Sequence, residues 1–348
     1  MSSDDLSTVL DPAELIFAGA SLAPDARPAS AITFDSRAVD GRTAFAALPG
    51  AQRHGRDYAT SALERGAPFV LTDQPGPRAA VVSDPTAVLR EWARRRRDQS
   101  GALVIGITGS AGKTTAKEYA AAALDAGRTP GNLNTLNAIA CYLLGEARRF
   151  PRHVVEMGID RPGEMAELRE LVNPSLGVVT AVGPAHLEAL GTVENVALEK
   201  GGIMLDRPGL VSEDAAPYYP GRDSYGFGPA ATHRGEDLRI EHGSTSFRYR
   251  GVPVTLQTPS TKVAAAALLG MVLAEREGVD LAAAAGRIAA VQVPGGRMLV
   301  QSGRITLLDD TYNANPLSVA AALEALGRYP GRRVAVLGDM RELGPDAA

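Results

Sequence analysis

Short apolar runs alternate with longer helical stretches through the middle of the chain. The runs at Leu103 to Ile107, His153 to Met157 and Leu176 to Ala181 have the length and composition of buried strands. The stretches between them have helical character, and one helix is expected to begin after Pro85. This order predicts a parallel sheet wrapped by helices over residues 84–298. Ligands collect at the carboxyl ends of parallel strands, so the residues that follow these runs are candidates for a site.

The two ends of the chain show shorter units of the same kind. Residues 1–83 contain short strand-like runs and one helix, which predicts a small α/β module; these elements lie at Ala31 to Phe34, Ala44 to Leu48, Tyr58 to Arg65 and Phe69 to Thr72. Residues 299–348 read as a strand, a helix and a second strand, at Arg304 to Leu308, Ser318 to Tyr329 and Arg333 to Leu337. Such a unit cannot bury a full core by itself, and the family resemblance given below implies that it is the start of a truncated, Rossmann-like C-terminal domain.

Length and charge narrow the class of protein. The chain has 348 residues, enough for two or three domains, and a formal net charge of −4. This charge gives no support to nucleic acid as a partner. We interpret the cluster Arg94 to Arg97 as the solvated face of a helix.

The N-terminus and the longest apolar stretch bear on location. Met1 to Leu10 lacks the basic start and apolar core of an export signal, which predicts a cytoplasmic protein. Val263 to Ala274 is well short of the roughly 20 residues that cross a bilayer, so no membrane span is expected. Cys141 is the only cysteine, which excludes a disulfide within the chain and favours a buried structural thiol.

The segment GITGSAGKTT joins the first strand of the central domain to a helix. A glycine loop that opens a helix presents backbone N–H groups to an anion, and a lysine and a hydroxyl after it suit the β- and γ-phosphates and Mg²⁺. Ile107 stands where the standard phosphate-loop pattern has its first glycine, so a plain glycine turn with a surface lysine is the alternative. The predicted nucleotide-binding residues here are Gly109, Ser110, Ala111, Gly112, Lys113, Thr114 and Thr115.

Further candidates follow later strands. Glu156 and His186 each end a predicted strand, where, with Thr114, they could hold Mg²⁺; alone, His186 would be an ordinary loop histidine. Lys200 is by default a surface lysine on a helix. Arg297 could bind phosphate oxygens.

The segment DDTYNANP comes directly after the strand at 304–308. Its acidic and amide groups, Asp310 and Asn313 among them, suit a ribose or a base edge. The same segment also has the composition of a turn that caps the next helix. Both interpretations can hold at once.

Taken in order, TGSAGKTT, the loop Gly131 to Asn134, VVEMG, VGPAHLEALG, PGGR, DDTYNANP and LGDMRELG resemble the Mur ligase family, from roughly Ala31 to the end of the chain. DDTYNANP and LGDMRELG favour the member that joins D-alanyl-D-alanine to UDP-N-acetylmuramoyl-tripeptide. The resemblance implies an ATP-dependent ligase of peptidoglycan synthesis that works through an acyl phosphate. It is expected to act as a monomer.

The resemblance also implies residue roles. Lys113, Mg²⁺ and Arg297 would offset phosphate charge, and Glu156 and His186 would hold the Mg²⁺. Lys200 would be carbamylated and so act as a carboxylate. The residues implied to bind the UDP-substrate are Asp35, Ser36, Arg37 and Asn134.

Several positions depart from the family pattern. The chain has Asn134-Thr135 in place of two asparagines, His54 to Asp57 in place of Asp-Gly-His-Asp, Thr261-Lys262 in place of His-Asn, and Gly201-Gly202 in place of Gly-Glu. These departures, with the short third domain, leave open a non-catalytic nucleotide-binding homologue or an inactive fragment that acts through interactions. An unrelated phosphate-loop ATPase would require the later motifs to be coincidence.

Overall fold

The structure, a computed structural model, describes residues 9–50, 52–241, 243–293 and 295–340. Residues 341–344 of the LGDMRELG segment, Pro294 of PGGR and the first eight residues of the predicted signal-free N-terminus lie outside this description. Contacts between Cα atoms divide the chain into two compact units. The first unit contains Met1–Leu103, Leu133–His153 and Glu167–Asn173, and the second contains Val104–Asn132, Val154–Ala166 and Pro174–Ala348.

The first unit is built on a five-stranded sheet with strand order β1-β5-β4-β3-β2. The pairs from β2 to β5 are parallel, and β1 is antiparallel to β5. Phe45 and Val70 pack with Ala62 of α1 in a buried apolar cluster, which explains why these short strands form. The bounds are β1 Ser21–Leu22, β2 Ala31–Thr33, β3 Thr43–Ala46, α1 Ala59–Glu64, β4 Val70–Thr72 and β5 Ala79–Val81.

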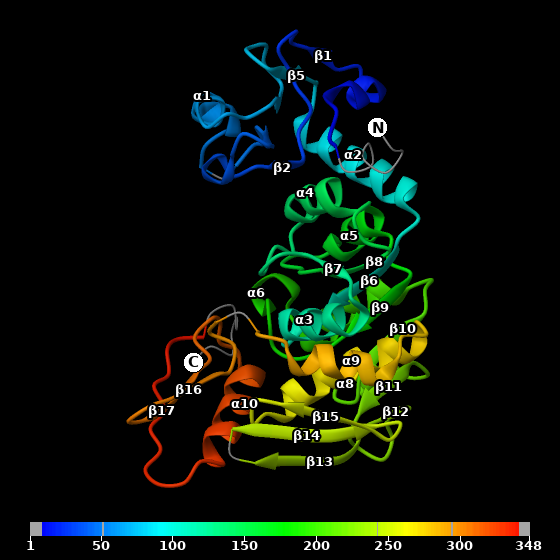
Figure 1. Cartoon of the computed structure of the whole chain (residues 1–348), viewed down its shortest axis with the longest axis vertical. Coiled ribbons are helices and arrows are strands. Elements are labelled where there is room, and N and C mark those ends of the chain that lie inside the picture. The colour runs from blue at the N-terminus through cyan, green and yellow to red at the C-terminus, as the bar shows by residue number, and fades with distance from the viewer. Residues whose placement is uncertain (1–8, 51, 242, 294, 341–348) are drawn as a thin grey trace. The chain divides into compact units, whose positions relative to one another are not determined.

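Two longer helices of the first unit are α2 and α4 (Figure 1). Helix α2 (Pro85–Ser100) begins at the predicted proline, is capped by the Asp84 side chain, and ends at Gly101 with positive φ. Helix α4 (Leu136–Glu146) packs against α2 and β2. Cys141 lies in α4 as a free, half-buried thiol, and burial raises its pKa to about 12; a structural role stays a prediction.

The second unit contains a seven-stranded sheet with order β12-β11-β10-β9-β6-β8-β7. The pairs that run from β6 through β9, β10 and β11 to β12 are parallel, which confirms the predicted α/β class with a central parallel sheet. The bounds are β6 Leu103–Thr108, β7 Gly127–Arg128, β8 Arg152–Glu156, β9 Leu176–Val179, β10 Gly209–Ser212, β11 Asp223–Gly226 and β12 His233–Arg234.

Helices α3 (Lys113–Leu124), α8 (Thr261–Arg276) and α9 (Leu281–Ala289) pack on one another beside this sheet (Figure 1). Helix α8 approaches α3 closely because Gly270 has no side chain: a Cβ there would lie 2.9 Å from the Tyr119 carbonyl oxygen. The apolar stretch from Val263 is therefore a buried core helix. No helix in the described part of the chain is long and apolar enough to cross a membrane.

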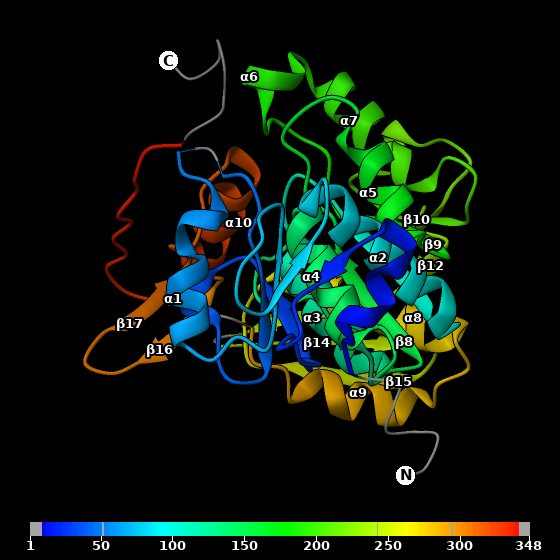
Figure 2. The ribbon, with the colours of Figure 1, turned by 90° about the horizontal axis from the view of Figure 1, so that it is seen from above.

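Three strands after residue 235 form an antiparallel sheet that the apolar pattern did not lead us to predict. Strands β13 (Glu236–Glu241), β14 (Ser244–Tyr249) and β15 (Val252–Leu256) pair in sequence order. Helix α9 lies against β15 (Figure 2). The remaining helices of the central region are α5 Glu164–Val172, α6 Leu187–Leu190 and α7 Val193–Gly201.

The C-terminal segment agrees with prediction only in part. Strands β16 (Leu299–Ser302) and β17 (Thr306–Asp309) form an antiparallel hairpin, and helix α10 (Pro316–Gly327) follows it (Figure 2). The predicted strand at 333–337 is wrong, since these residues have no regular structure. Val336, in the middle of this run, is 94% exposed. An apolar run forms a strand only where a neighbouring strand supplies its hydrogen bonds, and these residues form no such pair.

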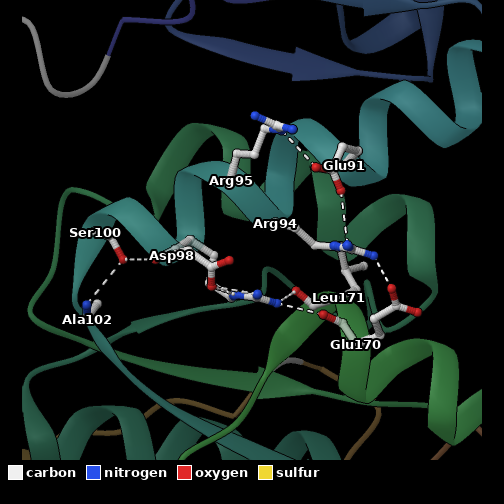
Figure 3. A network of polar contacts seen from close by, with 9 residues as sticks. Glu91, Arg94, Arg95, Asp98, Ser100, Ala102, Glu170 and Leu171 are labelled. Carbon is white, nitrogen blue, oxygen red and sulfur yellow. Dashed lines mark hydrogen bonds and ion pairs between the residues drawn. The ribbon is translucent and has the colours of Figure 1, made fainter. Parts of the chain in front are cut away.

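The arginine cluster on α2 is not one solvated face, so that interpretation is wrong for two of its members. Arg94 lies between Glu91 and Glu170, and Arg95 bonds Glu91 at 2.8 Å, both near the surface (Figure 3). Arg97 is buried and donates to the Glu170 carbonyl oxygen at 2.7 Å and to that of Leu171, at the end of α5. A cation suits this helix end, whose last carbonyls are otherwise unpaired.

Arg96 is the most buried member of the cluster, with 1% exposure. It donates to Glu14 Oε1 at 2.6 Å and to Oε2 at 3.1 Å, and it also bonds the Val9 carbonyl oxygen. Trp92 donates to the same carboxylate at 2.8 Å. Partial burial opposes ionisation of Glu14, but the bonds from Arg96 and Trp92 outweigh it and hold the carboxyl pKa below its usual value.

Candidate active site

The predicted phosphate loop has the expected backbone form. Strand β6 ends at Thr108, and Gly112 is the N-cap of α3 with φ of 79° and no side-chain cap. Gly109 has φ of 151°, and a Cβ there would lie 2.1 Å from Thr180 Oγ1. Glycine is therefore required at 109, and the first turn of α3 presents its N–H groups at the mouth of the loop.

The loop is held in place by the segment that follows β9. Ser110 N–H donates to the Ala181 carbonyl oxygen at 2.8 Å, and the Ser110 hydroxyl exchanges bonds with the Gly183 backbone at 3.0 and 3.1 Å. The Thr180 hydroxyl donates to the Ala111 carbonyl oxygen at 2.6 Å. These side-chain bonds make the loop a preformed cradle.

The loop's lysine and threonine make different contacts. The Lys113 ammonium donates to the Gly109 carbonyl oxygen at 2.7 Å, across the loop. The buried Thr114 hydroxyl donates to Glu156 Oε2 at 2.8 Å, while the next residue, Thr115, is half-buried. The structure thus brings Thr114 of the glycine loop into contact with Glu156, which was predicted from a separate motif.

Sequence reasoning missed Lys117, one turn further along α3. Its side chain is 0% exposed and donates to the Gly131 carbonyl oxygen at 2.5 Å. Its Nζ lies 3.6 Å from Glu156 Oε2 and 3.4 Å from Glu118 Oε1. The available signal was its spacing, since a residue four positions after Lys113 lies on the same side of the helix.

His186 lies at the start of α6 in a left-handed conformation, with φ of 55°. Its Nδ1 is 3.4 Å from Oδ1 of Asp160, a second residue that sequence reasoning missed. Within the described ranges, no three or more His, Cys, Asp and Glu side chains are arranged to hold a metal ion. Glu156 and His186 therefore need other ligands to complete a cation site.

Lys200 is not a surface residue, so the default interpretation is wrong. It lies on α7 with 0% exposure, and its Nζ is buried without a hydrogen-bond partner among the described residues. Burial, followed by the charge of Lys113, lowers the Lys200 pKa well below its usual value, against the opposing charges of Asp160 and Glu199. An unpartnered buried amine is costly, which makes this residue the least expected feature of the site.

Glu199, beside it in sequence, has a structural role. Its carboxylate accepts the N–H groups of Gly163 at 3.0 Å and of Met165 at 2.9 Å, at the start of α5. A carboxylate at a helix N-terminus satisfies free N–H groups and complements the helix dipole.

Arg297 and the DDTYNANP segment meet at the hairpin. The Arg297 guanidinium lies over the Tyr312 ring at 3.6 Å, and its Nη2 is buried without a hydrogen-bond partner in the described chain. Met298 N–H donates to Asp310 Oδ1 at 2.9 Å. Burial is the main cause that raises the Asp310 pKa.

The helix-cap interpretation of DDTYNANP is confirmed at Asn315. This residue forms a capping box with Ser318 at the start of α10, and its Nδ2 donates to the Ser110 carbonyl oxygen at 3.1 Å. Asn313 Oδ1 accepts the Ala314 N–H at 2.9 Å. The segment therefore caps a helix and also contacts the phosphate loop.

The predicted UDP-substrate residues lie in the first unit. Asp35 caps a short turn that contains Ser36, and both of its oxygens bond the Arg37 guanidinium, at 2.9 and 2.8 Å. The bonds from Arg37 lower the Asp35 pKa. Asn134 is half-buried just before α4. A substrate role for these four residues stays a prediction.

Three family models match the chain. They are the Mur ligase family catalytic domain over residues 28–123, the Mur ligase middle domain over 107–210, and the Mur ligase glutamate ligase domain over 296–348. Together they cover most of both units.

Named relatives and solved structures agree with these models. UDP-N-acetylmuramoyl-tripeptide–D-alanyl-D-alanine ligase of Treponema pallidum is 34% identical and covers 93% of this chain and 77% of its own. The Escherichia coli ligase of the same name is 32% identical, over 91% and 76%. MurF of Thermotoga maritima in complex with ADP has a TM-score of 0.78 and 27% identity, over 91% and 79%. MurF of Acinetobacter baumannii, at 24% identity and a TM-score of 0.84 over 97% and 81%, shows the same fold.

Proposed function

Because the chain belongs to the Mur ligase family, we propose that it joins UDP-N-acetylmuramoyl-tripeptide to D-alanyl-D-alanine with hydrolysis of ATP to ADP and phosphate. The observation that carries the proposal is the 34% identity to a relative of that name over 93% of this chain. A non-catalytic homologue gains no support, since each relative cited above carries the ligase name.

The phosphate loop suits the first chemical step. The tripeptide carboxylate would attack the γ-phosphorus, the bond to the β-phosphate oxygen would break, and ADP would leave an acyl phosphate. The N–H groups after Gly112 and the Lys113 ammonium, which lies across the loop, would offset the charge on the transferred group. The dipeptide amine would then displace phosphate from the acyl carbon and lose a proton.

Mg²⁺ is the cation that fits the donors present. The Thr114 hydroxyl and the Glu156 carboxylate already face each other at 2.8 Å, and both are oxygen ligands of the kind Mg²⁺ prefers. His186 is proposed as a supplementary ligand, and a carbamate on Lys200 as the missing anionic one. A bound Mg²⁺ would supply electrostatic stabilisation of the phosphate oxygens.

Other roles remain proposals that extend this function. Arg297, Asp310 and Asn313 would contact the nucleotide, and Asp35 to Arg37 with Asn134 would contact the UDP-substrate. The divisions 1–83, 84–298 and 299–348 would correspond to substrate-binding, ATP-binding and C-terminal ligase parts. A monomeric state and a cytoplasmic location are likewise predictions.

The proposed reaction makes ADP release depend on both substrates. We expect release with UDP-N-acetylmuramoyl-tripeptide and D-alanyl-D-alanine together to exceed release with either alone by at least about tenfold, because the acyl phosphate forms and breaks down only in sequence. A coupled ADP assay with L-alanyl-L-alanine as the matched control measures this. An ADP release rate that is the same with and without D-alanyl-D-alanine would contradict the ligase proposal.

Lys200 is expected to carry a carbamate when CO₂ is present. The reaction needs a neutral amine, and the lowered pKa keeps Lys200 neutral at a pH where an exposed lysine is protonated. The amine attacks CO₂, forms an N–C bond and releases one proton, so the carbamate is lost as pH falls through the Lys200 pKa. ¹³C-bicarbonate NMR should show a carbamate resonance in the wild type. The Lys200→Met protein should lack it and the Lys262→Met protein, changed at an exposed lysine, should keep it. An unchanged resonance in Lys200→Met would exclude this site.

A further inference from the structure

Lys117 is a cation built into the interior of the second unit. Its side chain has no exposed surface, and a buried ammonium is costly unless charges or dipoles compensate it. Three oxygens do so: the Gly131 carbonyl at 2.5 Å, Glu118 Oε1 at 3.4 Å and Glu156 Oε2 at 3.6 Å. The fold therefore maintains a positive charge beside a proposed metal ligand.

The two carboxylates around Lys117 are not equivalent. Glu118 has a second cation, because Arg128 Nε lies 2.5 Å from its Oε2 and is itself half exposed. Glu156 is 1% exposed, and the Lys117 Nζ lies 3.6 Å from its Oε2. Arg128 therefore shares in compensating Glu118, while the Lys117 charge lies buried beside Glu156.

Lys117 lies near the same Glu156 oxygen that faces the proposed cation site. Glu156 Oε2 both accepts the Thr114 hydroxyl at 2.8 Å and faces Lys117. A divalent cation bound between Thr114 and Glu156 would meet the Lys117 charge across that oxygen. At such short range the repulsion is strong even with protein screening.

A second lysine at the site adds to this repulsion. The Lys113 ammonium is a further positive charge at the phosphate loop, and the described chain contains no three-residue metal-binding cluster. The polyphosphate of a nucleotide would reverse the balance, since its negative charges would offset the positive charge of the lysines and attract the metal.

We propose that Lys117 is a positioning residue that holds Glu156 as its internal counter-charge and thereby makes divalent-cation binding depend on bound nucleotide. This inference rests on the proposed metal site and adds an order of binding to it. The cation enters with the polyphosphate, and the nucleotide-free protein holds it weakly.

Removal of the Lys117 charge has two opposite consequences. In Lys117→Met, a straight uncharged side chain replaces the ammonium, so Glu156 attracts a free divalent cation more strongly. With one nearby positive charge removed, the site also repels phosphate groups more strongly, so the nucleotide binds more weakly when no metal is present. A residue that merely supports the fold would weaken both events when it is replaced.

The experiment measures Mn²⁺ by electron paramagnetic resonance and nucleotide by calorimetry, at one pH. Lys117→Met should bind Mn²⁺ without nucleotide at least about tenfold more tightly than wild type, and should bind a non-hydrolysable ATP analogue without metal several-fold more weakly. Lys117→Arg keeps the charge and should behave as wild type toward Mn²⁺. Arg287→Met is the matched control, since it removes a cation that bonds the Ala122 and Ala123 carbonyl oxygens at the far end of α3.

The outcomes separate this inference from the function on which it rests. Equal Mn²⁺ binding by wild type and Glu156→Gln in the presence of nucleotide would refute the metal site itself. If Glu156 matters but Lys117→Met leaves nucleotide-free Mn²⁺ binding unchanged or weaker, the role of Lys117 is wrong. Should Lys117→Met fail to fold, the wild type decides: Mn²⁺ bound as tightly without the ATP analogue as with it overturns the proposal.

Discussion

Lys113→Ala is expected to lower ATP turnover by about 10²–10³-fold or more and to leave the fold intact. The ammonium lies across the phosphate loop, 2.7 Å from the Gly109 carbonyl oxygen, where it can offset charge on a transferred phosphate. The loop itself depends on other bonds, such as those between Ser110 and Gly183. Loss of the lysine should therefore remove charge stabilisation and preserve the cradle.

Steady-state ADP release and thermal unfolding test this prediction together. Lys113→Arg, which keeps a positive charge, serves as the matched variant and should retain more activity than the alanine protein. Turnover in a folded Lys113→Ala protein equal to that of the wild type would remove the phosphate-loop assignment.

Among the arginines at positions 94–97 of α2, Arg96 is expected to contribute most to stability. We expect Arg96→Met to lower the free energy of unfolding of the first unit by about 2–3 kcal/mol. Removing one partner of a buried pair costs about 3–5 kcal/mol, and we reduce this because Glu14 is 35% exposed and can regain water. The variant also leaves the Val9 carbonyl oxygen without its bond to Arg96.

Denaturant unfolding of Arg96→Met beside Arg95→Met measures the difference. Arg95 lies on the same helix, pairs with Glu91 and is half exposed, so its loss should cost less than about 1 kcal/mol. Because the pKa of Glu14 is depressed in the folded protein, its contribution is present above the unfolded-state pKa and is lost as pH falls through the folded-state pKa. The difference between the free energies of unfolding of the two variants should therefore become smaller at acidic pH. Equal stabilities at neutral pH would show that the Arg96–Glu14 pair contributes nothing.

Helical spacing predicts the burial of two charged side chains better than their charge does. Leu89, Trp92 and Arg96 follow one another at intervals of three and four residues, so they share a face, and the structure buries all three. Val196 and Lys200 share a buried face of α7 in the same way. In both helices we predicted an exposed side chain from its charge, whereas the spacing of the apolar residues correctly indicates a buried one.

The antiparallel strands could also have been found from local pattern. In β14 the residues Thr245, Phe247 and Tyr249 alternate with more exposed neighbours, and Gly251 follows with positive φ at the turn into β15. By contrast, nothing local distinguished the apolar run at 333–337 from a strand. A strand is stable only when a second strand pairs with it, and residues 333–337 alone do not show whether such a partner is present.

The sequence by itself determined the glycine loop between β6 and α3, the α/β class and the family, because each depends on residues that are close together in the chain or on the order of several short motifs. The form of the loop follows from Gly109 and Gly112, which alone permit its backbone. The tertiary structure decided which charges are buried and with what they pair. Lys117 on α3 meets Glu156 at the end of β8, and Lys200 is buried without a hydrogen-bond partner among the residues that the structure describes. Desolvation and pairing arise only when distant segments pack together, so no single segment could reveal them.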